Sequence, residues 1–497
     1  MERQFHLCLS PDALESDASL LDTVKEAGVH KVWLAGFLYG YWHYPIEQLV
    51  RWREQILRRG MSVGIINVPL GHPGDSLGAM HGNVPLTPPT HWKMGVRPDG
   101  SMYAGTSLHP PACEENQQAL RLLAQHGFRE VFLDDDFRLA QSPGIVGGCF
   151  CDRHREQFLR RYGYSGAHWE ELLHAVQNRI LTPVLRHWCH FHCDELRDCF
   201  RALQQAAPGL QLGIMVMFMG AEKAGVRLSD YSKVPFRVGE GMFDDGSFGN
   251  VKGKTNELFS VLFHRRFVRP ELAYSETTAY PANSLAARNM AAKLVISTLA
   301  DVRHTMFMSG LSPFPRSHWE TLAPAMRQQA RLHQQLAGQR MTGPLKHFWG
   351  EAGRYVGDDN PYSLFLAMGV PFEVVDKPPR EGWVFLSDQD ATELPASTWK
   401  GSRAIRVVRS HVPTEGEVRR VEESLPALFE LKREVVATLK ATPWIEEDKP
   451  VVCAWYPRIR TVALWNLAEN GERLTVRFNE RRHVVSVPGL ELALLKL

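Results

Sequence analysis

The sequence is poor in the features that mark secreted, membrane-spanning and polyanion-binding proteins. Its 497 residues include 8 cysteines, too few for a disulfide scaffold. No stretch approaches the ~18 consecutive apolar residues of a membrane span, and the first residues show no signal-peptide pattern. Lys and Arg number 57 against 55 for Asp and Glu, so bulk charge offers little attraction to nucleic acid. We therefore expect a cytoplasmic protein with no membrane and no nucleic-acid partner.

A glycine-rich phosphate loop is also missing after the first predicted strand, so no dinucleotide fold and no organic cofactor are expected. Instead, short apolar runs alternate with amphipathic stretches, one of which (169–206) is predicted to be a single long helix. The eight runs expected as buried strands are 5–9, 31–37, 62–68, 130–135, 211–218, 236–242, 272–276 and 305–309. Eight strand–helix repeats predict an α/β fold, a (β/α)8 TIM barrel over residues 1–342, with an open doubly wound sheet as the alternative.

The pattern changes after the barrel. Within residues 343–440, the runs 371–375, 383–387 and 404–408 predict parallel strands, and 415–435 predicts a helix with a charged face, which indicates a small α/β domain. Residues 441–497 are almost entirely strand-like and predict a small antiparallel, β-sandwich-like domain. Asn470 and Gly471 have the composition of a hairpin turn between two of its strands.

Carboxylates follow three predicted barrel strands, at the end where the catalytic groups of such barrels lie. Asp134, Asp135 and Asp136 follow the fourth strand, Glu240 follows the sixth and Glu276 ends the seventh. Three consecutive carboxylates are costly to assemble because like charges repel, so we favour a functional role over a helix cap or a loop ion pair. Two carboxylates facing each other across a cleft are the arrangement that cleaves glycosidic bonds.

Several cysteines cluster in a metal-binding pattern. Cys149, Cys151 and His154 fall within six residues, and Cys113 lies upstream of them. Three thiolates and one imidazole would make a closed tetrahedral zinc site of the structural type. The alternative is that the cysteines are small buried residues. The cysteines that we expect to be ordinary core residues are Cys8, Cys189, Cys193, Cys199 and Cys453.

Aromatic side chains crowd the same end of the predicted barrel. Tyr41 and Trp42 follow the second strand, and Phe243 follows the sixth. Such rings stack against the C–H faces of sugars, although loops also pack on their own aromatics. Together with Asn67 and Arg138, which lie at neighbouring strand ends, they are the expected substrate-binding residues.

Three stretches of the sequence resemble the glycoside hydrolase family 42 β-galactosidases. Residues 133–137 occupy the place of the family's Asp-Asn-Glu-Tyr segment, 149–163 resemble its zinc loop and following helix, and 109–113 resemble the segment with the remaining zinc ligand. The domain order also fits: a barrel, a flavodoxin-like trimerisation domain and a small β domain. The resemblance implies a glycosidase acting on a small glycoside or oligosaccharide, a structural zinc ion and a homo-oligomer, either a trimer or a dimer.

The resemblance also implies roles for individual residues. Glu276 matches the nucleophile and Asp136 the general acid/base. Asp135 matches the family's Asn that contacts the sugar, and in the glycosidase hypothesis Asp134 and Glu240 would also line the site or orient its groups. The zinc ligands implied by the resemblance are Cys113, Cys149, Cys151 and His154, with His154 in place of a cysteine.

Two departures from the family bear on its reaction. The family has Glu where this chain has Asp136, and the shorter Asp withdraws its carboxyl by about 1.5 Å. Because retaining pairs lie ~5–5.5 Å apart and inverting pairs ~6.5–9.5 Å, retention is expected but inversion stays open. Asp135 replaces a neutral Asn, which predicts a specificity different from that of an ordinary β-galactosidase.

Two other functions stay open from the residues alone. A metal-dependent barrel lyase or hydrolase could hold Mg²⁺ on the 134–136 cluster together with Asp244 or Asp245. A sugar-binding barrel that has lost catalysis would also fit the departure at Asp136.

Overall fold

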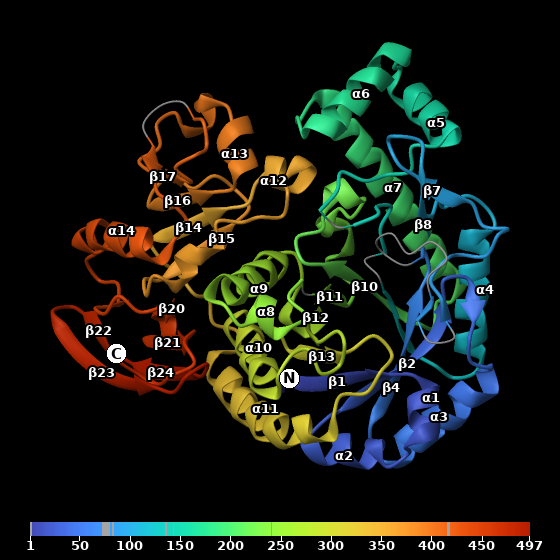
Figure 1. The fold of residues 1–497 in the computed structure, drawn as a ribbon, viewed down its shortest axis with the longest axis horizontal. Coiled ribbons are helices and arrows are strands. Elements are labelled where there is room, and N and C mark those ends of the chain that lie inside the picture. The colour runs from blue at the N-terminus through green and yellow to red at the C-terminus, as the bar shows by residue number, and fades with distance from the viewer. Residues whose placement is uncertain are drawn as a thin grey trace.

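The computed structural model describes residues 2–71, 80–81, 84–134, 137–142, 144–239, 241–414 and 418–497. Eight parallel strands close into a barrel, because β1 pairs with β13 on one side and with β2 on the other (Figure 1). In barrel order the strands are β1 (Gln4–Leu9), β2 (Lys31–Leu38), β4 (Ser62–Val68), β9 (Glu130–Leu133), β10 (Gln211–Met217), β11 (Phe236–Gly239), β12 (Ala273–Thr278) and β13 (His304–Met308). The predicted TIM barrel is confirmed.

The barrel strands are buried on both faces, because helices cover their outer face and side chains fill the barrel interior. All eight residues of β2 are buried, and so are all six of β12, although most of the latter are polar. The surrounding helices turn amphipathic faces inward; the helix α3, for example, buries Leu49, Trp52 and Ile56. The main covering helices are α2 (Leu20–Ala27), α3 (Ile46–Arg58), α4 (Ala112–Gln125), α7 (Pro183–Ala206), α9 (Val251–His264), α10 (Ala287–Leu299) and α11 (Arg316–Leu336).

A helical lobe projects from the barrel between β9 and β10 (Figure 1). The prediction of one long helix over 169–206 is wrong, because the chain forms two helices there. The first ends where Arg179 adopts a left-handed conformation (φ 54°), and the second begins with Thr182 as its cap and Pro183 at its first position. The lobe consists of α5 (Asp152–Tyr162), α6 (Gly166–Asn178) and the first turns of α7.

A five-stranded parallel sheet follows the barrel. The three parallel strands expected at 371–375, 383–387 and 404–408 are present, and β14 and β18 extend the sheet. The helix expected over 415–435 begins later, at Leu425, because Ser424 takes the capping position and Pro426 occupies the first turn. The strands, in sheet order, are β15 (Phe372–Val375), β14 (Leu345–Phe348), β16 (Trp383–Leu386), β17 (Ile405–Val408) and β18 (Arg419–Arg420), with helices α12 (Glu351–Val356), α13 (Asp388–Glu393) and α14 (Leu425–Ala437).

The C-terminal residues form two three-stranded antiparallel sheets. One contains β19 (Trp444–Ile445), β22 (Glu472–Phe478) and β23 (Arg481–Val487), and the other contains β20 (Val451–Tyr456), β21 (Thr461–Asn466) and β24 (Leu492–Lys496). The hairpin predicted at Asn470 and Gly471 is wrong, because the strands on either side of it, β21 and β22, belong to different sheets. The tight hairpin lies one strand later, where Asn479 and Glu480 both have positive φ (47° and 67°) between the paired strands β22 and β23.

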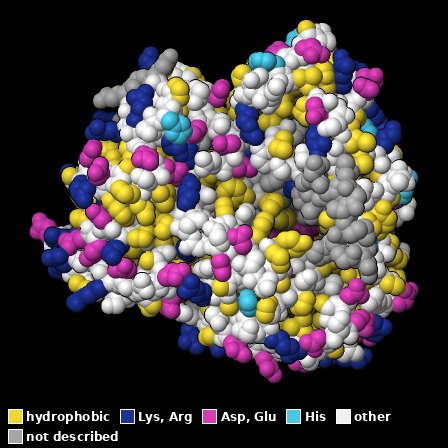
Figure 2. Space-filling view, in the orientation of Figure 1, with side chains coloured by type: hydrophobic (Ala, Val, Ile, Leu, Met, Phe, Trp, Pro, Cys, Tyr) yellow, Lys and Arg dark blue, Asp and Glu magenta, His cyan; other side chains and the backbone are white. Residues whose placement is uncertain are grey.

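The face of the molecule seen in Figure 2 is mixed in charge and is hollowed between the helical lobe and the domain that carries α12 and α13. Among the described residues, no helix is long and apolar enough to span a lipid bilayer.

Candidate active site and metal group

A buried cation joins two of the predicted carboxylates inside the barrel. Asp134 directly follows β9, Arg237 lies within β11 and Glu276 lies within β12. Arg237 is fully buried, and its Nη2 donates a hydrogen bond to Oδ1 of Asp134. Its Nε lies 3.1 Å from Oε2 of Glu276. One guanidinium therefore compensates two carboxylates that come from different strands.

The surroundings of this ion group include sulfur atoms and an aromatic ring, which are polarisable. The sulfur atoms of Met306 and Met215 lie 2.7 and 3.1 Å from the Arg237 nitrogens, and the ring centre of Phe132 lies 5.3 Å from its guanidinium carbon. Charges removed from water are stable only when they are paired with good geometry. Asp134 and Glu276 can therefore remain buried as charged groups only because Arg237 pairs with both of them.

Glu276 has a second contact from its own strand. Thr278 donates a hydrogen bond from its hydroxyl to Oε1 of Glu276, while Oε2 faces Arg237. Because the two residues are two positions apart on β12, their side chains lie on the same face of the strand. Both oxygens of the carboxylate are thus oriented by neighbours.

The structure brings Asp134 and Glu276 together, but it places the other expected substrate-binding residues in more structural roles. Asn67 is buried; its Oδ1 accepts a hydrogen bond from the Phe37 backbone (2.9 Å) and its carbonyl accepts one from the Asp134 backbone (2.8 Å). Tyr41 and Trp42 form the short strand β3, which pairs antiparallel with the end of β2, and both are half-buried.

Arg138 and Phe243 also contact the chain itself. Arg138 is buried, and its Nε donates to the carbonyl of Ala140 (3.1 Å). Phe243 is half-buried, and its carbonyl accepts hydrogen bonds from Tyr280 and Ser284. The expected site residues Asp135, Asp136 and Glu240 lie outside the described residues.

The carboxylates suggested as further Mg²⁺ ligands are engaged elsewhere. Asp244 caps the short helix α8 (Asp245–Phe248), and Asp245 accepts hydrogen bonds from the Ala286 backbone (2.9 Å) and the Asn289 side chain (2.7 Å). Asp134 already faces the Arg237 cation. Each of these three carboxylates therefore has a protein partner, and the other two of the suggested set, Asp135 and Asp136, lie outside the described residues.

Two buried charged residues that the sequence patterns did not reveal hold the turn after β11. Glu257 on α9 is 3% exposed, and its Oε1 accepts hydrogen bonds from the backbones of Gly241 (3.1 Å) and Met242 (2.9 Å). Lys293 on α10 donates from Nζ to the Met242 carbonyl (2.5 Å). Burial raises the pKa of Glu257 to about 8, the backbone donors act against this, and the charge of Glu276 raises it further. The signal in the sequence was a charged residue within a mainly apolar stretch, Lys293 between Ala292 and Leu294 and Glu257 before Leu258 and Phe259.

A separate cluster of nitrogen and sulfur atoms could hold a metal ion. The ligand atoms of His109, Cys151 and His154 all lie within 4.8 Å of one another. His109 Nε2 is 3.2 Å and His154 Nδ1 is 3.4 Å from the Cys151 sulfur. The local fold explains the spacing, since Cys151 caps α5 and His154 is the third residue of that helix.

The remaining two predicted ligands differ in their surroundings. Cys149 contacts the cluster through a hydrogen bond to Cys151. Hydrogen bonds from Cys149, His109 and His154 hold the pKa of the Cys151 thiol below its ordinary value against the effect of burial. Cys113 instead lies in the first turn of α4, with its sulfur 3.4 Å from that of Cys199 on α7.

In the described structure it is His109, and not the predicted Cys113, whose ligand atom lies with those of Cys151 and His154. The sequence points to the right segment, 109–113, but this segment contains two residues that can bind a metal, His109 and Cys113. Cys113 lies in the first turn of α4, which directs it towards Cys199 on α7. A carboxylate on α7 orients the cluster from outside: Glu195 Oε1 lies 3.3 Å from His154 Nε2, which leaves Nδ1 facing Cys151. A histidine whose second nitrogen is held by a carboxylate is typical of metal ligands.

No protein-family model matches the sequence, and no curated protein matches it. Solved structures do match. A β-galactosidase from the Antarctic haloarchaeon Halorubrum lacusprofundi is 12% identical, with a TM-score of 0.63 over 99% of both chains. A catalytic mutant of Gan42B, a GH42 β-galactosidase from G. stearothermophilus, is 11% identical, with a TM-score of 0.62 over 99% of this chain and 98% of that one. The β-galactosidase of the psychrophilic Marinomonas ef1 is 9% identical, with a TM-score of 0.61 over 99% of this chain and all of that one. Across its whole length, the chain has the fold of the GH42 β-galactosidases.

Proposed function

We propose that this protein is a glycoside hydrolase that removes a terminal sugar from a small glycoside or oligosaccharide. The observation that carries the proposal is the oriented carboxylate of Glu276 in the barrel, held by Arg237 and Thr278. The fold supports it, since the solved structures that share it include several β-galactosidases.

In the proposed reaction, Glu276 attacks the anomeric carbon while an acid protonates the leaving oxygen. We assign the acid to Asp136, two residues after the buried Asp134, from its match to the family's acid/base position. The carboxylate of Asp136 then accepts a proton from water as the ester between the sugar and Glu276 is hydrolysed. Arg237 would act as a positioning residue that keeps Glu276 in place without reacting itself. The shorter Asp136 and the extra charge of Asp135 underlie the proposal of a β-galactosidase-like enzyme with altered specificity.

A panel of aryl glycosides that differ in sugar and anomer tests this function, with product anomers followed by NMR. Wild type should hydrolyse one glycoside, and Glu276→Gln should lose at least about a thousandfold in kcat. Azide should restore turnover to Glu276→Ala and yield a glycosyl azide of inverted configuration, because a small anion can replace a missing nucleophile. Glu320→Gln, an exposed site on α11, is the matched control. Binding of a sugar without any turnover on the panel would instead identify a non-catalytic sugar-binding barrel.

We also propose that the metal group holds a structural zinc ion. Two thiols and two imidazoles suit zinc, whose ligands in proteins are thiolates and neutral histidines in a tetrahedral arrangement. The residues that would hold it are His109, Cys149, Cys151 and His154. A bound ion would fix the loop before α4 and the start of α5 in one arrangement and would take no part in the reaction.

By the same resemblance, we propose that the five-stranded sheet domain mediates a homo-oligomer, either a trimer or a dimer. Light scattering coupled to size-exclusion chromatography tests this proposal, because a single monomeric mass at micromolar concentration would contradict it.

A further inference from the structure

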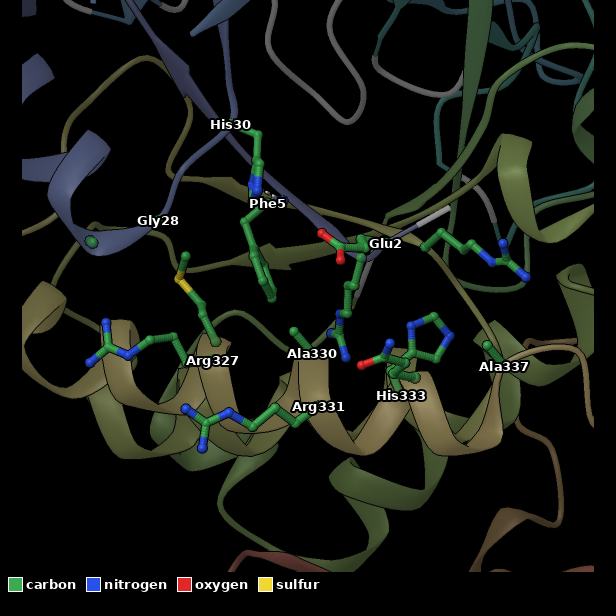
Figure 3. A pocket seen from close by; sticks show the side chains of 14 residues that line it. Glu2, Phe5, Gly28, His30, Arg327, Ala330, Arg331, His333 and Ala337 are labelled. Carbon is green, nitrogen blue, oxygen red and sulfur yellow. Dashed lines mark hydrogen bonds between the residues drawn. The ribbon is translucent and has the colours of Figure 1, made fainter. Parts of the chain in front are cut away.

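A cavity of about 600 Å³ opens at the opposite end of the barrel from Glu276. It lies where β1, β2 and β13 begin, and it is closed on its other side by α2 and α11 (Figure 3). In Figure 3, Arg327 and Arg331 follow each other along α11, and Phe5 and His30 reach in from the other side. Barrel enzymes carry their catalytic groups at the other end, so this cavity is not explained by the proposed reaction.

One wall of the cavity contains a buried cation that has no carboxylate partner among the residues that the structure describes. Arg3 is 4% exposed, and its guanidinium donates hydrogen bonds to neutral oxygens, those of Thr298, Leu294 and Thr305. Its buried Nε has no hydrogen-bond partner among the described residues. Burial lowers the pKa of Arg3 to about 9, and no carboxylate offsets that effect. An uncompensated buried charge is costly, which favours a ligand that supplies the missing negative charge.

The rim of the cavity adds further positive charge. Arg327 and Arg331 are exposed and lie one helical turn apart, and their guanidinium groups have no ion-pair or hydrogen-bond partner within the described part of the chain. Arg303 also lines the cavity, but it contacts Glu271 and Asp301. Against these cations, the cavity lining contributes one carboxylate, the exposed Glu2.

The same cavity has an apolar side. Phe5 and Met326 are buried and line it together with Ala330. Its volume lies within the range of sites for small organic molecules, about 300–1,000 Å³. Arginine is well suited to oxyanions because its planar fork can donate two parallel hydrogen bonds. The ligand that matches all three features is a small organic molecule with an oxyanion group.

We propose that this cavity at the base of the barrel binds a phosphorylated small molecule, with the phosphate held by Arg3, Arg327 and Arg331. Phe5 and Met326 would contact the organic part. The site is distinct from the residues assigned to glycoside cleavage and would hold its ligand whether or not that assignment is right.

Isothermal titration calorimetry with inorganic phosphate, glucose 6-phosphate and glucose tests the proposal at low ionic strength. Wild type should bind phosphate and bind glucose 6-phosphate more tightly, with both affinities falling as NaCl is added. The double variant Arg327→Gln/Arg331→Gln should weaken phosphate binding at least about tenfold, because two charged donors are lost. Since phosphate contains no sugar, this result is independent of the proposed glycosidase function.

The control is Arg458→Gln/Arg473→Gln, which removes the same charge from two exposed arginines of the C-terminal domain. Phosphate binding to this control should match wild type. Arg3→Met should abolish phosphate binding, and far-UV circular dichroism checks that this variant folds. If it does not fold, the result of Arg327→Gln/Arg331→Gln decides the test. Absence of phosphate and glucose 6-phosphate binding to wild type, or equal weakening in the control, would overturn the proposal.

Discussion

Arg237 and Glu276 contact each other inside the barrel, with Nε of the arginine 3.1 Å from Oε2 of the glutamate. The arginine also holds Asp134. A single cation on β11 therefore fixes one carboxylate that follows β9 and another that lies on β12. In the proposed reaction this arrangement would tie stability to function, since the group that makes burial of Glu276 tolerable also sets its orientation.

Replacing Arg237 by Met should destabilise the protein by about 3–5 kcal/mol, because it leaves two buried carboxylates without their cation. Chemical denaturation measures the loss. The triple variant Arg237→Met/Asp134→Asn/Glu276→Gln removes the carboxylate charges as well and should recover most of it. If the single variant is as stable as wild type, the ion group does not compensate these charges.

The raised pKa of Glu257 predicts a pH dependence of stability. Below its ordinary pKa of 4.5, the carboxyl is protonated in both the folded and unfolded states. As the pH rises towards about 8, the unfolded chain releases the proton while the folded protein retains it, so the free energy of unfolding falls. Glu257→Gln keeps the shape and does not titrate, and it should lack this fall, a difference on the order of 4 kcal/mol.

Urea denaturation of wild type and Glu257→Gln at several pH values between about 5 and 8 makes the comparison. Glu320→Gln serves as the control and should follow the wild-type curve, because its side chain is exposed. Parallel curves for wild type and Glu257→Gln would show that Glu257 ionises in the folded protein as readily as in the unfolded chain.

Metal analysis separates the structural assignment of the zinc ligands from the sequence-based one. We expect about one zinc ion per chain in wild type and less than about a tenth of that in His109→Ala and Cys151→Ser. Cys113→Ser should retain the full content, because its sulfur faces Cys199. Loss of zinc from Cys113→Ser, with full content in His109→Ala, would restore the sequence-based ligand set.

The barrel could be predicted from the sequence because its strands are local apolar runs with helices between them, a pattern that short windows reveal. Turn geometry was harder to predict. Asn470 and Gly471 have hairpin composition, yet Asn466 bonds to the carbonyls of both Asn470 and Val487 and so links the chain leaving one sheet to the end of β23 in the other. Composition describes which conformations a turn allows, whereas tertiary contacts decide which strands it joins.

Only part of the site could be predicted from the sequence, because the remaining part also depends on tertiary contacts. Glu276 stands out at the end of an apolar strand, but Arg237 is a single charge within one, and only the closed barrel shows that it lies between two carboxylates. Likewise, His109 and Cys113 are both plausible ligands in sequence, and the direction in which α4 begins separates them. Such choices depend on contacts between segments that are distant in the chain.

Thr278 and Thr277 offer a closely matched test of how Glu276 is oriented. Both are buried neighbours on β12, but alternate residues of a strand face opposite sides, and Thr278 is the one that donates to Oε1 of Glu276. Thr278→Val keeps the shape and removes the donor, so kcat should fall about tenfold, since a hydrogen bond to a charged group contributes about 1.5–3 kcal/mol. Thr277→Val should leave kcat within about twofold of wild type on the same aryl glycoside. Equal losses in the two variants would mean that the hydroxyl acts through packing of the strand, and unchanged kcat in Thr278→Val would remove it from the positioning of Glu276.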